Sequence, residues 1–135
     1  MNAKKGSYIF TAVIFAAVAV FLLAGNLMGV SAAVSGDELT VKAMLFSESV
    51  KYSDIESAEI QSGISYGTRT FGSDFLGVKS GNFSNATFSN YKCAVYSSQK
   101  NAAVITKKDG SRLVFNVKDA DELENIVSAV TEQTA

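Results

Sequence analysis

The feature that most constrains this chain is an uncharged segment, residues 6–36, which precedes every acidic residue. Within it, residues 9–34 form a predominantly apolar run of 26 residues. As a helix this run would be roughly 39 Å long, more than the roughly 30 Å of a bilayer core. The sequence therefore predicts one membrane-spanning helix over residues 8–34, after a short N-terminal segment, residues 1–7.

Two other interpretations of the same run remain open. Lys4 and Lys5 precede it, and Val30-Ser31-Ala32 offers small residues at the positions that a signal peptidase reads, so it also fits a cleaved secretory signal. A retained anchor is favoured because the run exceeds the ~7–15 residues of a usual signal core. A buried helix is disfavoured because the remaining chain has too little surface to wrap a helix that is apolar all round.

The flanking charges predict which side of the membrane the rest of the chain occupies. Lys4 and Lys5 lie before the run, whereas Asp37 and Glu38 follow it. Because positive residues stay on the cytoplasmic side, we expect a single-pass protein of the cell membrane with its globular part outside the cytoplasm. The alternative is a secreted domain, released by cleavage near Ala32.

Composition excludes several classes of function. The chain of 135 residues has no histidine and one cysteine. Without histidine there is no Ser-His-Asp or Cys-His catalysis and no histidine-containing zinc site. Beyond the two N-terminal lysines, 12 − 2 = 10 basic residues face 13 acidic ones, which disfavours nucleic-acid binding. We therefore assign no catalytic residue, no metal site and no cofactor, and expect Cys93 to be a buried, inert thiol.

Residues 37–135 change to the alternating pattern of strands. Alternation over 39–45 predicts a first strand, a turn at Phe46-Ser47 leads to a second over 49–52, and a third follows over 55–60. Five glycines in residues 63–81 instead predict an ordered loop that packs partly on the core through its interleaved aromatic residues.

The second half has the clearer pattern. Strands are predicted over 91–96, 102–106 and 111–117, the last two joined by an Asp109-Gly110 hairpin turn. A C-terminal amphipathic helix follows, with Asp119 as its N-cap and Glu122 as the capping-box partner. Its apolar stripe comprises Leu123, Ile126, Val127 and Val130.

These pieces together resemble one known family. The run YSDIESAEI, the segment GTRTFG, the stretch 77–83, the strand 91–96 and the ending VITKKDGSRLVFNVKDADELENIV are similar to the bacterial PH-domain family over residues 37–131. The resemblance implies a mainly β, PH-like antiparallel barrel or sandwich, capped by the C-terminal helix and preceded by one transmembrane helix. It implies a fold more than an activity.

The resemblance directs attention to the loops. PH domains that bind phosphoinositides use a basic loop between their first two strands, whereas Phe46-Ser47-Glu48 is short and acidic here, so phosphoinositide binding is not expected. The candidate site is the glycine-rich segment, with Arg69 as a donor to an anionic group, Tyr66 and Phe71 as packing surface, and Lys79. The alternative is that Arg69 only pairs with Asp74.

Two functions follow as hypotheses. The first is a membrane-anchored, non-catalytic module that contacts a protein partner, or a second copy, through a strand edge or the glycine-rich loop. The second is a secreted or anchored ligand-sensing domain, or an enzyme, with a small-molecule pocket near that loop.

Overall fold

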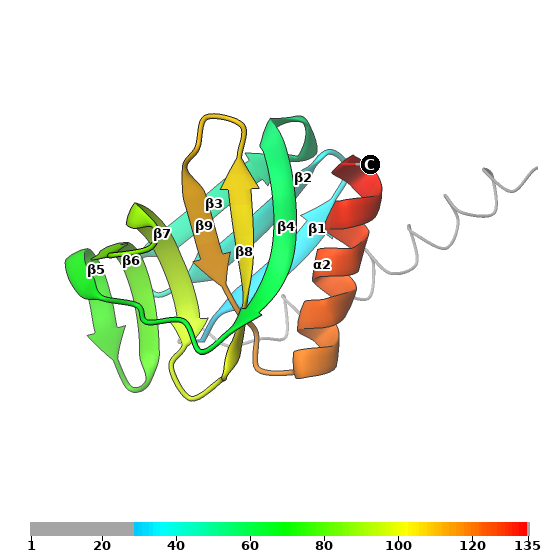
Figure 1. Ribbon diagram of the computed structural model, residues 1–135. Coiled ribbons are helices and arrows are strands. Elements are labelled where there is room, and N and C mark those ends of the chain that lie inside the picture. The colour runs from blue at the N-terminus through cyan, green and yellow to red at the C-terminus, as the bar shows by residue number, and fades with distance from the viewer. Residues whose placement is uncertain (1–28, 135) are drawn as a thin grey trace, which may run out of the picture.

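The computed structural model describes residues 29–134, which form two sheets and a C-terminal helix (Figure 1). Helix α2 spans Ala120–Thr134, and a short 3-10 helix, η1, spans Tyr52–Asp54. In chain order, the strands are β1 (Ser31–Ser35), β2 (Glu38–Ala43), β3 (Phe46–Lys51), β4 (Ile55–Ser62), β5 (Thr68–Phe75), β6 (Val78–Asn85), β7 (Ser89–Tyr96), β8 (Asn101–Lys107) and β9 (Arg112–Phe115).

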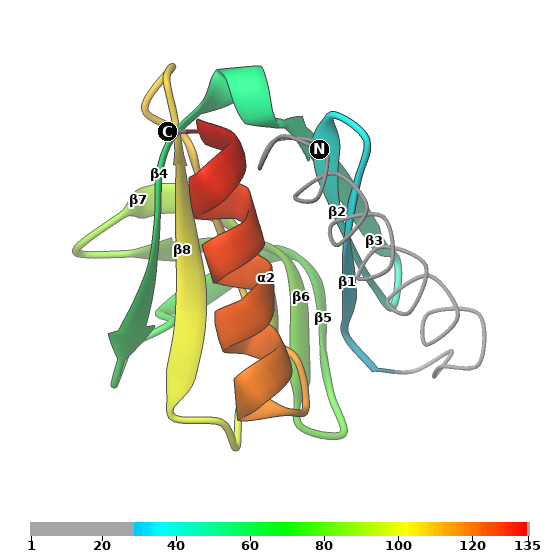
Figure 2. The same cartoon turned by 90° about the vertical axis from the view of Figure 1, so that its right-hand side faces the viewer.

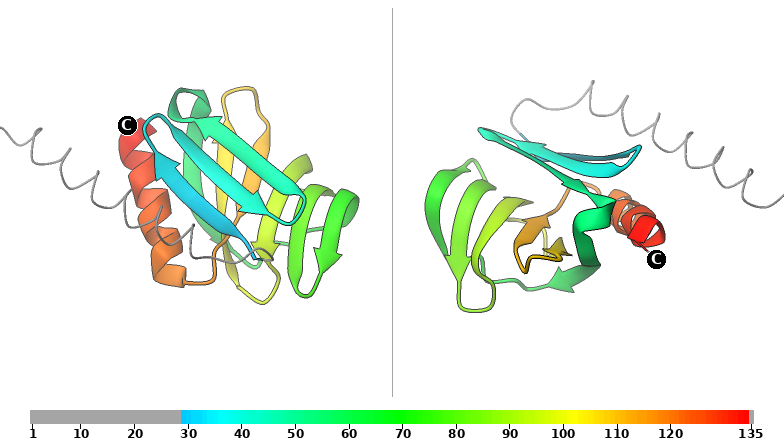
Figure 3. Two further views of the ribbon diagram at one scale, coloured as in Figure 1. Left: turned by 180° about the vertical axis from the view of Figure 1, so that it is seen from behind. Right: turned by 90° about the horizontal axis from the view of Figure 1, so that it is seen from above.

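The strands form two separate sheets that face each other. The smaller has the order β1-β2-β3 and the larger β4-β8-β9-β7-β6-β5 (Figures 1 and 3). The predicted mainly β fold with a C-terminal helix is confirmed, but the described strands make a sandwich and do not close into a barrel. The sheets are also not wholly antiparallel, because β9 inserts between β7 and β8 and runs parallel to β7.

Helix α2 covers the opening between the two sheets beside β1 and β4 (Figure 2). Its four predicted apolar residues are all buried. The Asp119 carboxylate accepts hydrogen bonds from the backbone N–H groups of Asp121, at 2.8 Å, and Glu122, at 3.4 Å, which confirms Asp119 as the cap. The 3.6-residue period therefore located this element correctly.

The larger sheet carries buried apolar side chains on both faces. Its inner face, the smaller sheet and α2 enclose the main core, which includes Leu39, Ile105 and Phe115. On its outer face a second cluster forms around Phe83, Tyr91 and Cys93. The expected burial of Cys93 is confirmed, and burial raises the pKa of its thiol to about 12.

The N-terminal boundary of the domain was predicted wrongly. Residues 31–34, assigned to the end of a membrane helix, lie in β1, where Ala32 pairs with Val41 and is buried. The domain thus begins before residue 37, because alternate residues of this uncharged stretch complete the main core. None of the helices within residues 29–134 has the length and apolar character needed to cross a membrane. Residues 8–28 of the predicted span lie outside the described residues.

The glycine-rich segment is also more regular than predicted. Only residues 63–67 form a loop, and the rest belongs to the β5–β6 hairpin. Gly72 lies opposite Gly81, and a Cβ atom on Gly72 would lie 2.7 Å from the Cα of Gly81. These two glycines allow the backbones of β5 and β6 to approach closely, so they are part of a strand pair and not of a loop.

The predicted turn at Phe46-Ser47 is likewise displaced. Phe46 pairs with Ala43, so the turn consists of Met44 and Leu45. Glu48, expected in a loop, therefore lies within β3 on the side that faces the larger sheet. This displacement gives Glu48 the role described below.

Candidate functional site

The loop of residues 63–67 packs on the outer face of the larger sheet. Ile64 and Tyr66 contact the second cluster, and the Tyr66 carbonyl accepts a 2.6 Å hydrogen bond from the Tyr91 hydroxyl. Desolvation raises the pKa of Tyr66 to about 12. The expectation that this loop is ordered and packed is confirmed, and Tyr66 is a packing residue in the structure.

The other candidates from the glycine-rich segment lie on the β5–β6 hairpin. Arg69 and Phe71 are exposed on β5, which is an edge of the larger sheet. Asp74 pairs with Lys79, at 2.7 Å, and not with Arg69. Arg69 and Phe71 are therefore exposed on the strand edge. Tyr66 instead packs on the second cluster, and Lys79 forms an ion pair with Asp74.

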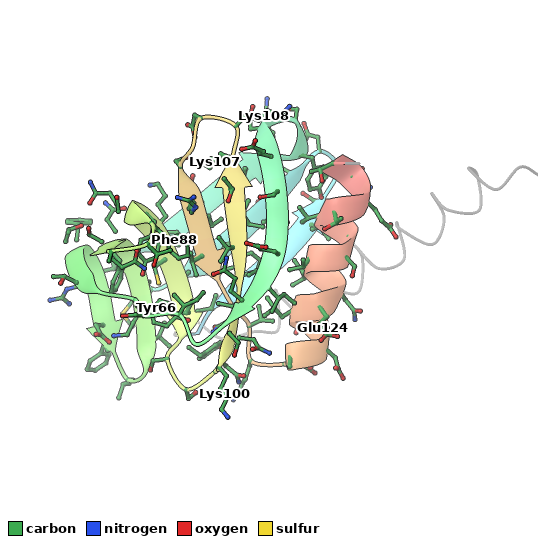
Figure 4. All side chains as sticks on the ribbon, in the orientation of Figure 1. Tyr66, Phe88, Lys100, Lys107, Lys108 and Glu124 are labelled. Carbon is green, nitrogen blue, oxygen red and sulfur yellow. The ribbon has the colours of Figure 1, made fainter. Side chains whose placement is uncertain are left out.

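A polar hollow lies beside this edge, and we refer to it as the polar notch. It opens where β7 begins and the β8–β9 hairpin extends past it, and its volume is about 460 Å³. Figure 4 labels Lys107, at the end of β8, and Phe88, just before β7. The notch is lined by Thr70, Asn82, Asn90, Tyr91, Lys92, Lys107, Ser111 and Arg112.

Cationic groups predominate in the polar notch. The Glu48 carboxylate forms ion pairs with Lys107 Nζ, at 3.1 Å, and with Lys92 Nζ, at 3.5 Å, so two lysines share one carboxylate. Arg112 stacks over the Phe88 ring, 5.2 Å from its centroid. Two lysines on one carboxylate leave one positive charge in excess, and the Arg112 guanidinium adds a second, so the notch carries a net positive charge.

The polar notch is directly continuous with the β5 edge. Thr70 lies on β5 and its hydroxyl donates to the Asn82 carbonyl at 3.1 Å, next to a bulge between Arg69 and Phe71. Beyond the bulge, residues 71–75 pair regularly with β6. An extended segment along β5 could therefore pair with its backbone and direct an acidic group into the notch.

Sequence patterns alone did not reveal the notch. Three different strands, β7, β8 and β9, supply Lys92, Lys107 and Arg112. In the sequence, each of these residues alone predicts only a solvent-exposed charged side chain on a strand. They meet because β9 inserts between its neighbours, which the alternation of apolar residues does not encode. A weak signal was available in the polar residues at strand ends, although it did not distinguish these lysines from others.

Comparison with known proteins supplies one match. A family model described as "Bacterial PH domain" matches residues 30–130 of the chain. The match covers all nine strands of the described structure and most of α2. No significant match was found among curated proteins or among solved structures.

Proposed function

Because this chain belongs to the bacterial PH-domain family, we propose that it is a non-catalytic binding module, held at a membrane by residues 8–28, that binds an acidic segment of a protein partner. The observation that carries this proposal is the polar notch, which is lined by Lys92, Lys107 and Arg112 beside a strand edge, with the two lysines paired to Glu48. The orientation follows the flanking charges, with the domain outside the cytoplasm.

The chemistry of the notch supports recognition more than reaction. Its cations can donate to carboxylates, and its hydroxyl and amide groups can complete the hydrogen bonding of a polypeptide. The single thiol of the chain, Cys93, has its pKa raised, which is opposite to what a nucleophile requires. Exposed Arg69 and Phe71 on β5 would add a charged and an aromatic contact to the same partner.

A membrane crosslinking experiment tests this proposal. A photoreactive amino acid is placed at Phe71 in the full chain, and crosslinked partners are compared with those captured from Lys108, an exposed residue of the β8–β9 turn. We expect a partner specific to Phe71, lost when Lys92 and Arg112 are both replaced by alanine and weakened by Arg69→Ala. Capture that is unchanged in these variants would contradict a role for the notch.

A small anionic ligand is the second candidate, because the volume of the notch lies within the range of ligand pockets. This alternative places the pocket beside β7 and β9 and not at the loop of residues 63–67. Thermal shift with inorganic phosphate and short dicarboxylates distinguishes the two functions. A rise in melting temperature that Arg112→Ala removes, with no crosslinked partner, would favour the small ligand.

A further inference from the structure

Two hairpin turns expose apolar side chains at one end of the domain. The β2–β3 turn carries Leu45, which is 84% exposed, and the β5–β6 turn carries Leu76, which is 73% exposed. Phe75 precedes Leu76 and is 55% exposed. We refer to these three residues as the apolar tips, since each lies at or beside the end of a hairpin.

The two turns are held together. The Ser80 hydroxyl, itself buried, donates a 2.8 Å hydrogen bond to the carbonyl of Met44 and so links the larger sheet to the β2–β3 turn. An open hollow of about 240 Å³ lies between the turns, with Phe75 and Leu76 on one side and Met44 on another. The apolar tips therefore form one surface contributed by both sheets.

The conformation of the two leucines costs stability. Leu45 has φ of 56° and Leu76 has φ of 51°, in the left-handed region that glycine and asparagine adopt more readily. Gly77 follows Leu76 with φ of 79°, so this turn has the geometry for which Asn-Gly is preferred. Leucine thus occupies two exposed positions where glycine or asparagine would suit the isolated domain better.

The chain enters the domain at the same surface. Gly29, the first described residue, lines the hollow beside Phe75 and Leu76. Figure 3 shows that β1 begins on the side where the β2–β3 and β5–β6 turns lie. The 20 residues before it, 9–28, carry no charge and as a helix would be roughly 30 Å long, about the thickness of a bilayer core.

We propose that the apolar tips insert into the interface of the bilayer that holds the chain. The inference rests on the anchorage in the proposed function, because a span that ends at residue 28 leaves no linker before Gly29 and sets this end of the domain on the lipid. Leu45, Phe75 and Leu76 then exchange water for the interfacial region, which accounts for apolar side chains at strained, exposed turns.

The contact orients the proposed binding surface. Thr70, at the polar notch, lies five residues from Phe75 on the same strand, which corresponds to roughly 17 Å along β5. With the apolar tips in the interface, the notch and the β8–β9 turn face the aqueous phase. A partner could then reach the β5 edge just above the membrane surface.

Site-directed fluorescence on the full chain tests the proposal. The chain is reconstituted in vesicles of phosphatidylethanolamine and phosphatidylglycerol, with an environment-sensitive probe on Leu76→Cys or, separately, Leu45→Cys. Lys108→Cys in the β8–β9 turn, at the opposite end in Figure 4, is the matched control. Cys93 is buried and does not compete for the label. Flotation of each preparation with the vesicles measures anchorage independently.

We expect all three proteins to float, with blue-shifted emission that brominated acyl chains quench at positions 76 and 45 but not at 108. Flotation with probes at 76 and 45 as water-exposed as at 108 would overturn the inference and leave anchorage intact. Probes shielded from water but not quenched by lipid would overturn it in favour of coverage by residues 9–28 or a second copy. Failure to float would overturn both the inference and the proposed anchorage.

Discussion

At the scale of single residues, the two leucines at hairpin turns oppose local stability. A non-glycine residue in the left-handed region costs about 1 kcal/mol or more relative to a residue that adopts it freely. Leu76 has this cost with little compensating burial, since its side chain is largely exposed. A contact of Leu76 outside the isolated domain would offset this cost.

Leu76→Asn should stabilise the isolated domain by about 1 kcal/mol, because Asn-Gly suits a turn with two positive φ angles. The measurement is the free energy of unfolding of residues 29–135 in urea. Lys108→Asn, in the exposed β8–β9 turn, is the matched control and should change little. A loss of stability in Leu76→Asn would mean that Leu76 makes a packing contribution in water.

The Cys93 thiol gives stability a pH dependence with a defined sign. Its pKa rises from 9.0 to about 12 on folding, chiefly through desolvation, so the folded state keeps a proton that the unfolded state releases. Its contribution is complete below pH 9 and is lost as the pH rises toward 12. We expect the free energy of unfolding to fall by on the order of 1 kcal/mol per pH unit above pH 9.

Urea unfolding between pH 8 and 10 measures this slope, with Cys93→Ala as the comparison. The variant should show a weaker dependence, and the part that it keeps comes from tyrosines such as Tyr52 and Tyr66, which begin to ionise in the unfolded state as the pH approaches 10, whereas folding raises their pKa to about 12. The native thiol should also resist alkylation at pH 8 and react after unfolding. Equal slopes in the two proteins would contradict the assignment.

At the scale of elements, the β5–β6 hairpin depends on the facing pair Gly72 and Gly81. A Cβ atom on Gly81 would lie 2.2 Å from the Phe71 carbonyl oxygen, a backbone atom that cannot move without breaking the pairing. Gly81→Ala should therefore cost about 3 kcal/mol or more, as other forced overpacking does. Gly110→Ala is the control, because its φ is positive but nothing lies within 4 Å.

Thermal unfolding of the two alanine variants checks this prediction. Gly110→Ala should lose only about 1 kcal/mol from its backbone conformation. Equal losses would show that the cost at Gly81 is conformational and not due to close approach. Protection of β5 amides from hydrogen exchange should also fall in Gly81→Ala alone.

The connection from β7 to β8 depends on a buried side chain outside any strand. Asn116 is fully buried, and its amide accepts from the Tyr96 N–H at 2.6 Å and donates to the carbonyls of Tyr96, at 3.1 Å, and Asn101, at 3.3 Å. The side chain thus satisfies backbone groups at both ends of the turn that joins β7 to β8, two strands that β9 separates in the sheet.

Asn116→Ala should destabilise the domain by roughly 2–3 kcal/mol, because it leaves buried polar groups without partners. Gln99→Ala removes a solvent-exposed hydrogen bond to the Lys118 carbonyl and should cost no more than about 0.5 kcal/mol. Chemical denaturation of both variants provides the comparison. A loss in Asn116→Ala as small as that in Gln99→Ala would indicate that water replaces the amide.

At the scale of the whole molecule, β1 decides where the domain can begin. Val30, Ala32 and Val34 are buried in the main core, and β1 pairs along its full length with β2. Cleavage after Ala32, the alternative drawn from the signal-like residues, would remove Val30 and Ala32 and shorten β1. A released domain with that N-terminus lacks part of its own core.

A chain that begins at Ala33 should therefore lose several kcal/mol relative to one that begins at Gly29, on the scale of losing buried apolar side chains and strand pairing. Cooperative thermal unfolding, followed by circular dichroism, distinguishes the two. Equal stabilities would show that β1 is dispensable and would restore cleavage near Ala32 as a route to a functional domain.

The sequence by itself determined the class of fold, the C-terminal helix with its Asp119 cap, several strands of the larger sheet and the inert character of Cys93. These features depend on hydrophobic periodicity and local propensity, which are properties of residues close together in the sequence.

Tertiary structure decided the features that depend on contacts between residues far apart in the sequence. Ser31–Ser35 is a strand because β2 and the core accept its alternate residues, although its composition matches a membrane run. The β5–β6 hairpin exists because two glycines face each other, and glycine spacing does not report which glycine faces which. The polar notch gathers charges from three strands, and the insertion of β9 between β7 and β8 that brings them together leaves no local signal.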